Sequence, residues 1–445
     1  MYGAESRMEK TKVGISDLEI YVPSPRMGLD TLVEHRVSQN PGFERRIKRA
    51  IEKTGQEAIR FPTPWEDSAT LAAQSSYALL RRNEKSTQRL RYIGTGTETT
   101  VDQSKPMAAY LEGMLQNSGI DVPETMMTFQ AQHACAGGTV AMLSAAGLLA
   151  QSDRDESGLV VSSDIARYDA PSTAEITQGA GAVSLLVEKN PQLIELDLGT
   201  QGLCSRDVDD FFRPIGSTTA KVKGAYSMQC YNEALETAFR DYCERRGEAP
   251  ADVLYGTDMF VFHVPFKMMA LGALHRLVST HTGLEGDELR EFVNDRGFEQ
   301  SLEPNTRVGN LYTASTFFAL AFLLKERYQK FGSDIVGKSI LMVYYGSGNT
   351  MVILSATVAP GAPEIIERWD LDSVFRNERD ATMDEYETWL AAPHSAERLQ
   401  ELVNSASVPQ GQFYLSGIRE DGYREYAFTG VPAAEEVQWA ATTTR

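Results

Sequence analysis

Residues 126–150 read MMTFQAQHACAGGTVAMLSAAGLLA, and this stretch is the most informative about the fold. Its first seven residues are β-rich, and residues 140–150 are apolar and rich in alanine, which predicts a strand that runs directly into a buried helix. Cys135 lies in the turn between them. At a helix N-terminus the helix dipole and unpaired N–H groups favour a thiolate over a thiol. On this local context a nucleophile and a buried structural thiol both remain open.

The rest of the chain alternates short apolar runs with helical patterns. Strands are predicted over 13–22, 91–94, 126–132, 158–162, 181–187, 259–262 and 340–345, and helices over 227–246 and 313–328. In the first helix Met228, Tyr231, Leu235, Phe239 and Tyr242 recur at steps of three and four, so they are expected to share one face. Strands interleaved with helices predict an α/β protein with a layered core. A boundary between two halves is expected within 190–202.

Composition excludes several classes of protein. The chain has 445 residues, 42% of them apolar, and a net charge of −18, which argues against a nucleic-acid or anionic-membrane surface. Its four cysteines form neither a CxxC pair nor a zinc pattern, so a cytoplasmic location in a reducing compartment is expected. The apolar run 314–324 is about half the ~20 residues of a bilayer span. Residues 1–12 carry no signal-peptide pattern and are predicted to be a disordered tail.

Two further side chains are candidates for chemistry. Glu98 follows a predicted strand among small Thr and Gly residues, where partial desolvation would raise its pKa and make it a proton acceptor. A solvated loop glutamate is the alternative. His263 ends the apolar strand 259–262 and is either a hydrogen-bonded core histidine or a site residue.

Two polar turns complete the candidates. Asn310 can orient a carbonyl, and the Gly346-Ser347-Gly348 turn can offer backbone donors, although each segment could equally be a cap or a plain turn. The sequence contains no Walker loop, no complete GxGxxG and no HExxH. Neither a metal nor a nucleotide cofactor is therefore expected.

Taken in order, these stretches resemble the 3-hydroxy-3-methylglutaryl-CoA synthase family of the thiolase superfamily, particularly its bacterial mevalonate-pathway members, from about residue 13 to about 426. The matching stretches are 97–102 (TETTVD), 134–135 (AC), 164–168 (DIARY), 178–183 (QGAGAV), 210–214 (DFFRP), 262–266 (FHVPF), 308–315 (VGNLYTAS), 345–348 (YGSG) and 413–416 (FYLS). The resemblance implies an αβαβα layered thiolase-like fold of two similar halves, residues 13–195 with the nucleophile and 196–430 with the His and Asn site residues. Residues 431–445 are then a polar tail.

The resemblance also implies an activity. It implies condensation of acetyl-CoA with acetoacetyl-CoA by a homodimer, in which Cys135 is the acylated nucleophile, Glu98 the general acid/base and His263 the group that positions acetoacetyl-CoA. Asn310 would bind the acetoacetyl carbonyl, and the backbone N–H groups of Cys135 and Ser347 would form the oxyanion hole. Coenzyme A thioesters are then substrates, and no resident cofactor is implied.

This chain departs from the family pattern at two places close to the expected substrate. Ala136 stands where the family usually has Tyr after the nucleophile, and Lys267 follows Phe266 directly, one residue earlier than the usual Lys. Lys267, Lys221 and Lys223 are the candidates for contacts with the coenzyme A phosphates.

Two other functions stay open at this point. The first is the related synthase of polyketide β-branching cassettes, which takes its acetyl donor from an acyl carrier protein. Residues 272–276 (GALHR) weakly resemble this type. The second is a catalytically inactive thiolase-like partner subunit. The presence of Cys135, Glu98 and His263 together argues against the second.

Overall fold

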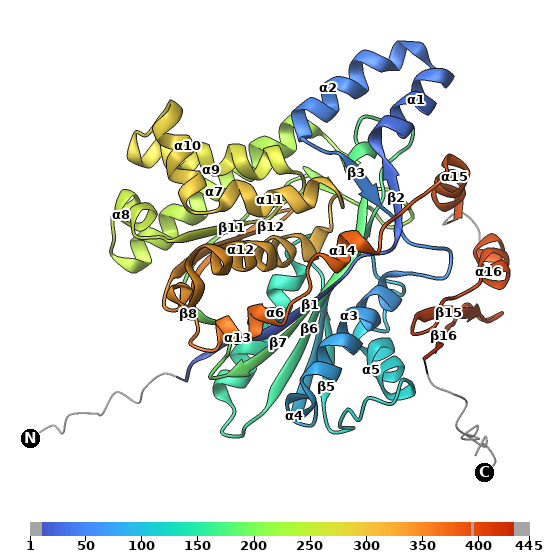
Figure 1. Cartoon of the computed structure of the whole chain (residues 1–445), viewed down its shortest axis with the longest axis horizontal. Coiled ribbons are helices and arrows are strands. Elements are labelled where there is room, and N and C mark those ends of the chain that lie inside the picture. The colour runs from blue at the N-terminus through green and yellow to red at the C-terminus, as the bar shows by residue number, and fades with distance from the viewer. Residues whose placement is uncertain (1–10, 393–395, 431–445) are drawn as a thin grey trace, which may run out of the picture.

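The computed structural model describes residues 11–392 and 396–430, and Figure 1 shows its helices and strands. The expected tails at 1–12 and 431–445 lie outside the described residues, apart from residues 11 and 12. Nine strands form one sheet with the order β11-β12-β13-β8-β1-β7-β6-β4-β5. Their bounds are β1 Val13–Tyr21, β4 Leu90–Gly96, β5 Met127–Ala131, β6 Ser157–Ala166, β7 Gly179–Lys189, β8 Ile194–Ser205, β11 Met259–Phe262, β12 Ser339–Gly346 and β13 Thr350–Val358.

The strand directions repeat on the two sides of the seam between β1 and β8. From β1 outward, β7 and β6 are antiparallel to their inner neighbours and β4 is parallel to β6. From β8 outward, β13 and β12 are antiparallel and β11 is parallel to β12. The seam itself is short and antiparallel, pairing Gly14 with Glu195 and Ile15 with Ile194. A Cβ on Gly14 would lie 2.0 Å from the Ile194 carbonyl oxygen, so only glycine permits this approach.

Two helices fill the space between the two halves of the sheet. These are α6, Gly137–Gln151, and α12, Ser315–Phe331, which is preceded by the 3-10 turn η3, Tyr312–Ala314. One apolar cluster joins their side chains to strands of both halves. Alternate strand residues face opposite layers: on β12, Met342 belongs to this middle cluster and Val343 to an outer one. Burial on both faces explains why these strands are continuous apolar runs.

The outer layers are also helical. On the first half, α3 (Ser68–Arg82) and α5 (Met107–Asn117) share an apolar cluster with β4 and β6. On the second half the outer helices are α7 Gly224–Arg246, α8 Pro250–Tyr255, α9 Lys267–Thr282, α10 Gly286–Asp295 and α11 Phe298–Thr306. The layers therefore run helix, sheet, helix, sheet, helix, with two similar halves. The predicted α/β thiolase-like fold is confirmed.

Smaller elements surround this core. The strands β2 (Pro25–Gly28), β3 (Ala58–Arg60) and β14 (Arg379–Asp380) form a small sheet, next to which α1 (Leu29–Gln39) and α2 (Glu44–Thr54) project at the top of Figure 1. The strands β9 (Phe211–Phe212) and β10 (Lys221–Val222) form a short hairpin. The other short elements are α4 Glu84–Thr87, α13 Ala362–Glu367, α14 Ser373–Arg376, α15 Met383–Ala391, α16 Ala396–Ser405, β15 Phe413–Ile418 and β16 Arg424–Phe428.

The predicted apolar face of α7 is buried over most of the length of the helix. Tyr231, Leu235, Phe239 and Tyr242 are buried in the second-half cluster, as their spacing predicts. Met228 is exposed, because the first turn of α7 extends beyond the core and reaches the mouth of a cavity.

Within the described residues, Ala134–Gln151 is one segment whose length and composition alone would allow it to cross a membrane. This segment contains α6. Ala141, Met142, Ala145, Ala146 and Leu149 are fully buried against both halves of the sheet, so packing in the middle layer accounts for the apolar character of this face of the helix.

Candidate active site

Cys135 lies in a tight turn between β5 and α6. Ala134, just before it, has a φ of 41°, a conformation that non-glycine residues rarely adopt. The N–H of Ala136 bonds to His133 and that of Gly137 to Ala134. A Cβ on Gly96 would lie 2.1 Å from the Gly138 nitrogen, so glycine at the end of β4 lets that strand approach the start of α6. Local strain of this kind is characteristic of functional sites.

Glu98 lies on the loop that follows β4 and faces the nucleophile candidate. The Cys135 thiol donates a hydrogen bond of 3.0 Å from Sγ to Glu98 Oε1. Asp164, fully buried at the end of β6, holds this loop: one of its oxygens accepts from the Glu98 N–H at 2.9 Å and from the Thr99 hydroxyl at 2.6 Å. Its other oxygen accepts from the Thr313 N–H at 3.1 Å. A single carboxylate therefore fixes two segments of the site.

Burial controls the protonation of both partners. It raises the pKa of Glu98 to about 8, with the charge of Asp164 acting in the same direction. Burial also raises the pKa of the Cys135 thiol, and the charges of Glu98, Asp164 and Asp210 add to the effect. The sequence predicted the opposite direction for Cys135. That prediction was wrong, because it considered the helix N-terminus alone and not the carboxylates that the fold brings next to the sulfur.

His263 enters the same space from the second half. It is 2% exposed at the end of β11, and its Nδ1 lies 2.7 Å from the Ser315 hydroxyl. Burial lowers the pKa of His263 to about 3, so the imidazole is neutral. The Ser315 hydroxyl already accepts from the Val264 N–H at 3.3 Å, so its proton is available to Nδ1. This arrangement favours the tautomer that carries its hydrogen on Nε2.

Asn310 is 3% exposed and is oriented by two hydrogen bonds. Its Oδ1 accepts from the Tyr312 N–H at 2.9 Å, and its Nδ2 donates to the Tyr168 hydroxyl at 3.2 Å. The Tyr312 backbone has a φ of 47°, so a second strained residue lies at this site.

Ser347 lies in the turn after β12, against the Cys135 turn. A Cβ on Gly346 would lie 2.3 Å from the His133 carbonyl oxygen and 2.9 Å from the Ala136 nitrogen, so the two turns are in close contact. In the described part of the chain, the N–H groups of Cys135 and Ser347 have no hydrogen-bond acceptor. Unpaired N–H groups in adjacent turns are suited to binding an oxyanion.

Of these residues, Cys135, His263, Asn310 and Ser347 line one cavity of about 380 Å³, and Glu98 lies behind Cys135, outside its lining. The cavity is lined by Cys135, His263, Asn310 and Ser347 together with Thr54, Tyr168, Thr173, Ala174, Thr177, Phe211, Val222, Gly224, Ser227, Met228, Pro265, Phe266, Met269 and Tyr345. Tyr168, Phe211 and Tyr312 pack edge to face, with ring centroids 5.8–6.4 Å apart, and form an apolar cluster with Cys135. The sequence interpretation recorded these aromatic residues only as parts of matching stretches. An aromatic residue recurs in these stretches, and this recurrence was the sequence signal that could have indicated an aromatic wall of the site.

The three lysine candidates occupy different positions. Lys267 begins α9, and its ammonium contacts Glu303 at 2.5 Å and Glu299 at 3.3 Å, so two carboxylates already neutralise it. Lys221 is paired with Asp169 at 3.1 Å. Lys221 and Lys223 both line a neighbouring cavity of about 630 Å³, which shares Tyr168 and Phe211 with the first.

The helix α2 is a further basic feature that the sequence interpretation passed over. Its sequence, ERRIKRAIEKT, exposes Arg45, Arg46, Arg49 and Lys53 in a chain whose net charge is −18. Its last residue, Thr54, lines the cavity that contains Cys135. The dense run of basic residues was visible in the sequence, but its position beside the site was not.

Ala136 does not line this cavity. Its side chain is fully buried, and a Cβ built on Gly346 would lie 2.8 Å from it. The first departure from the family pattern is therefore located between the two turns.

The layered fold and the cysteine at the head of a middle-layer helix define a thiolase-like protein. Two family models agree with this class: the hydroxymethylglutaryl-coenzyme A synthase N-terminal model matches residues 9–192, and the C-terminal model matches residues 194–295 and 288–429. The chain belongs to the hydroxymethylglutaryl-CoA synthase family.

Individual relatives span nearly the whole chain. A hydroxymethylglutaryl-CoA synthase of Haloferax volcanii is 27% identical over 94% of this chain and 99% of its own length, and one of Enterococcus faecalis is 28% identical over 85% and 91%. Among solved structures, MvaS in complex with 3-hydroxy-3-methylglutaryl coenzyme A superposes with a TM-score of 0.81 at 32% identity, covering 95% of this chain and all of that one. The curacin pathway HMG synthase in complex with holo donor-ACP has a TM-score of 0.79 at 24% identity, a likeness of fold.

Proposed function

We propose that this protein condenses acetyl-CoA with acetoacetyl-CoA to give 3-hydroxy-3-methylglutaryl-CoA, through an acetyl group carried on Cys135. The observation that carries the proposal is the 3.0 Å contact between Cys135 Sγ and Glu98 Oε1, at a cavity that also contains His263 and Asn310. Membership of the hydroxymethylglutaryl-CoA synthase family supports the same substrates.

In the first step the Cys135 sulfur attacks the acetyl thioester. The thiol proton passes to Glu98, whose Oε1 already accepts its hydrogen bond. The carbonyl oxygen becomes an oxyanion, which the unpaired N–H groups of Cys135 and Ser347 stabilise. Collapse of this intermediate breaks the bond to the coenzyme A sulfur, which takes the proton from Glu98 as it leaves, so that Cys135 remains acetylated and Glu98 is a carboxylate again.

In the second step Glu98 removes a proton from the acetyl methyl group. The thioester acidifies this methyl only modestly, so the same two N–H groups must hold the enolate oxygen. A carboxylate with a pKa of about 8 is a stronger base than an ordinary glutamate and is better matched to this task.

In the third step the enolate carbon forms a bond to the C3 carbonyl of acetoacetyl-CoA. The neutral His263 donates from Nε2 to this carbonyl, and Asn310 orients it. Protonated Glu98 returns its proton to the new alkoxide. Water then cleaves the thioester to Cys135, which gives a free carboxylate and regenerates the thiol.

The coenzyme A phosphates need cations at the mouth of the cavity. We propose that Arg49 and Lys53 on α2 supply them, together with Lys223, because these side chains are exposed and α2 ends at Thr54 on the cavity wall. Lys267 and Lys221 are less available, since carboxylates already pair with both. Phosphate groups bind such basic clusters through charge-assisted hydrogen bonds.

We further propose a homodimer formed through β5 and α6. The strand β5 is an edge of the sheet, and its Met127 is 46% exposed. Next to it, α6 carries an apolar stripe in which Val140 and Leu143 are partly buried and Gly147 and Leu148 are exposed, Leu148 to 39%. An apolar face beside an open strand edge is suited to pairing with a second copy.

Three further expectations belong to this proposal. The nucleophile half and the half with His263 and Asn310 correspond to residues 13–195 and 196–430, with the changeover at the start of β8. All four cysteines are free thiols, which suits a reducing cytosol. The reaction requires no resident cofactor, because the thioesters themselves supply the activated groups.

An acyl carrier protein is the second candidate for the acetyl donor. Two exposed apolar side chains, Val222 and Met228, line the cavity, and exposed Tyr226 lies between them in the sequence. They would suit a protein-borne donor as well as the pantetheine arm of coenzyme A. Comparing acetyl-CoA with an acetyl-carrier protein as donor decides between them, and a strong preference for the carrier protein would replace acetyl-CoA in the proposal.

The direct test is the condensation itself, with Glu98→Ala as the diagnostic variant. The wild type should convert the two thioesters into 3-hydroxy-3-methylglutaryl-CoA. Glu98→Ala should lose about 10³-fold in condensation, since a general base contributes 10²–10⁴. Its acetylation should persist, because loss of the Glu98 charge lowers the thiol pKa and offsets the lost proton acceptor. An undiminished condensation rate would refute the mechanism, and a wild type that forms no acetyl-enzyme would be the inactive partner subunit.

A further inference from the structure

One wall of the cavity is the segment from Tyr168 to Gln178, which contains the 3-10 turn η2, Glu175–Thr177. Tyr168, Thr173, Ala174 and Thr177 line the cavity from this segment. It lies directly against Asn310: the Asn310 N–H donates to the Thr177 carbonyl at 3.1 Å, and a Cβ on Gly179 would lie 2.7 Å from the Asn310 carbonyl oxygen. A shift of this wall must therefore move Asn310.

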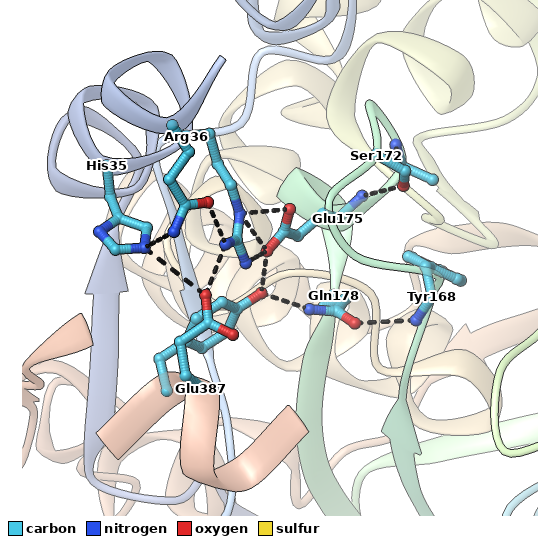
Figure 2. Close-up of polar contacts among 10 residues, drawn as sticks. His35, Arg36, Tyr168, Ser172, Glu175, Gln178 and Glu387 are labelled. Atoms are coloured by element: carbon cyan, nitrogen blue, oxygen red, sulfur yellow. Dashed lines mark hydrogen bonds and ion pairs between the residues drawn. The ribbon is translucent and has the colours of Figure 1, made fainter. Parts of the chain in front are cut away.

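Behind the wall lies a polar network that the proposed chemistry does not use (Figure 2). Glu175, fully buried, forms an ion pair with Arg36 of α1, with 2.6 Å between Nη2 and Oε1. The hydroxyl of Tyr386, on α15, donates to the same Glu175 oxygen at 3.1 Å. Arg36 also contacts Glu387 of α15 at 2.5 Å, so both neighbouring residues of that helix are anchored.

The network continues to the site through Gln178. Its Nε2 donates to the Tyr386 hydroxyl at 2.6 Å, and its Oε1 accepts from the Tyr168 N–H at 2.8 Å. The Tyr168 hydroxyl in turn accepts from Asn310 Nδ2 at 3.2 Å. Gln178 and Tyr386 are both fully buried, so each polar atom depends on these partners.

In this network the donor and the acceptor of each hydrogen bond are determined by the groups at its two ends. The Arg36 cation keeps Glu175 as an acceptor, so the Tyr386 hydroxyl must point its hydrogen at Glu175 and accept from Gln178. The Gln178 amide is then fixed with its nitrogen toward Tyr386 and its oxygen toward Tyr168. The Tyr168 N–H requires the same orientation, because it can only donate; without the Tyr386 hydroxyl, the buried Gln178 nitrogen loses its acceptor, and the amide that holds Tyr168 is tethered at one end only.

We infer that Tyr386 and Gln178 are positioning residues for Asn310, through which helix α15 near the C-terminus controls binding of the acetoacetyl thioester. The inference rests on the proposed function, in which Asn310 orients the acetoacetyl carbonyl. Neither residue touches the cavity, so their effect must be indirect. Although Tyr168 packs beside Cys135, the network forms no hydrogen bond with Cys135 or Glu98, so we expect acetylation of Cys135 not to depend on Tyr386 or Gln178.

Tyr386→Phe is the variant that tests the inference. It should raise both the Kd and the KM of acetoacetyl-CoA about tenfold, the scale of one lost buried hydrogen bond that leaves the Gln178 nitrogen without an acceptor. The rate of acetylation of Cys135 by acetyl-CoA should stay unchanged. Tyr242→Phe is the matched control: it removes a buried hydroxyl near Arg246, at the far end of α7, and should leave both steps unchanged.

A coupling measurement separates positioning from a general structural effect. In an Asn310→Ala background, Tyr386→Phe should cause no further loss of acetoacetyl-CoA affinity. Gln178→Met, which keeps the volume and removes the amide, should reproduce the effect of Tyr386→Phe and serves if that variant is unstable. Equal losses in acetylation and in acetoacetyl-CoA binding, full additivity with Asn310→Ala, or wild-type affinity would each overturn the inference. Because affinity is measured by calorimetry, failure of the wild type to condense would refute the proposed function separately.

Discussion

Glu98 and Cys135 form a buried pair whose proton is shared between a carboxylate and a sulfur. Negative charge lies close to the thiol, since Asp164 and Asp210 raise its pKa as Glu98 does, while the Arg213 cation lowers the pKa of Glu98 against the effects of burial and Asp164. A resting thiol rather than a thiolate follows from this arrangement. The nucleophile therefore forms as its proton is removed during the reaction, and the protonation state of Glu98 governs the rate.

The pH dependence of condensation tests this coupling. Burial and Asp164 raise the pKa of Glu98 to about 8, so below that pH the carboxyl is protonated and cannot act as a base. The condensation rate should therefore rise with pH and level off above about 8, falling about tenfold per pH unit on the acidic side. A pH–rate profile of condensation measures this directly. A limb centred near the ordinary glutamate value of 4.5 would contradict the assignment.

The limits of sequence interpretation are clearest at this residue scale. Cys135, Glu98, His263, Asn310 and Ser347 were all selected from local patterns and a family resemblance, and the structure brings them to one place. The direction in which the pKa of Cys135 shifts could not be predicted, because it depends on carboxylates from three separate segments. Nor could the network of Arg36, Glu175 and Tyr386, whose members are more than a hundred residues apart and carry no shared motif.

At the scale of elements, two turns and one helix determine the site. The strand ends and helix starts follow from apolar periodicity, so the sequence predicted most of them: β11 matches its expected bounds, 259–262. The strand β6 extends to Ala166, beyond the predicted 162, because polar Ser163 and Asp164 are buried by contacts with distant segments. Propensity alone does not reveal such contacts.

The contact between the Cys135 turn and the Ser347 turn depends on Gly346. In Gly346→Ala the new methyl would lie 2.3 Å from the His133 carbonyl oxygen, so the turns must separate and the oxyanion N–H groups move apart. Acetylation of Cys135 should fall about 10²-fold, the scale of losing one oxyanion donor. The control is Gly113→Ala on α5, where no atom lies within 4 Å of the new methyl and acetylation should be unchanged. Normal acetylation in Gly346→Ala would exclude this pair of turns as the oxyanion hole.

The charge of α2 provides a test at the same scale. Arg49→Glu with Lys53→Glu should raise the KM of acetyl-CoA by about tenfold at low ionic strength, and the effect should shrink as salt is added. The KM of acetyl-S-pantetheine, which lacks the phosphates, should not change. Arg240→Glu on α7, an exposed residue paired with Glu236, is the control for altered net charge. A parallel change for both donors would show that α2 does not bind phosphate.

At the scale of the whole molecule, two similar halves meet at a short seam and leave one edge of the sheet open. The first half supplies the nucleophile and Glu98, and the second supplies His263 and Asn310. The repeat of strand directions was not visible as sequence identity between the halves. It is a property of topology, which tolerates almost complete divergence of side chains.

The open edge predicts an oligomer. Leu148→Glu places a charge in the apolar stripe beside β5 and should convert a dimer into monomers, because burying that charge without a partner is costly. Leu203→Glu is the control, since Leu203 is 47% exposed on β8, away from this edge. Sedimentation equilibrium measures both. A monomeric wild type, or a Leu148→Glu variant that remains dimeric, would rule out this interface.

The most direct measurement follows the acetyl group itself. Purified protein should be incubated with acetyl-CoA, digested and examined by mass spectrometry, and then given acetoacetyl-CoA. We expect one acetyl group per chain, located on Cys135, which disappears as 3-hydroxy-3-methylglutaryl-CoA forms. A Cys135→Ala variant that still joins the two thioesters would contradict it.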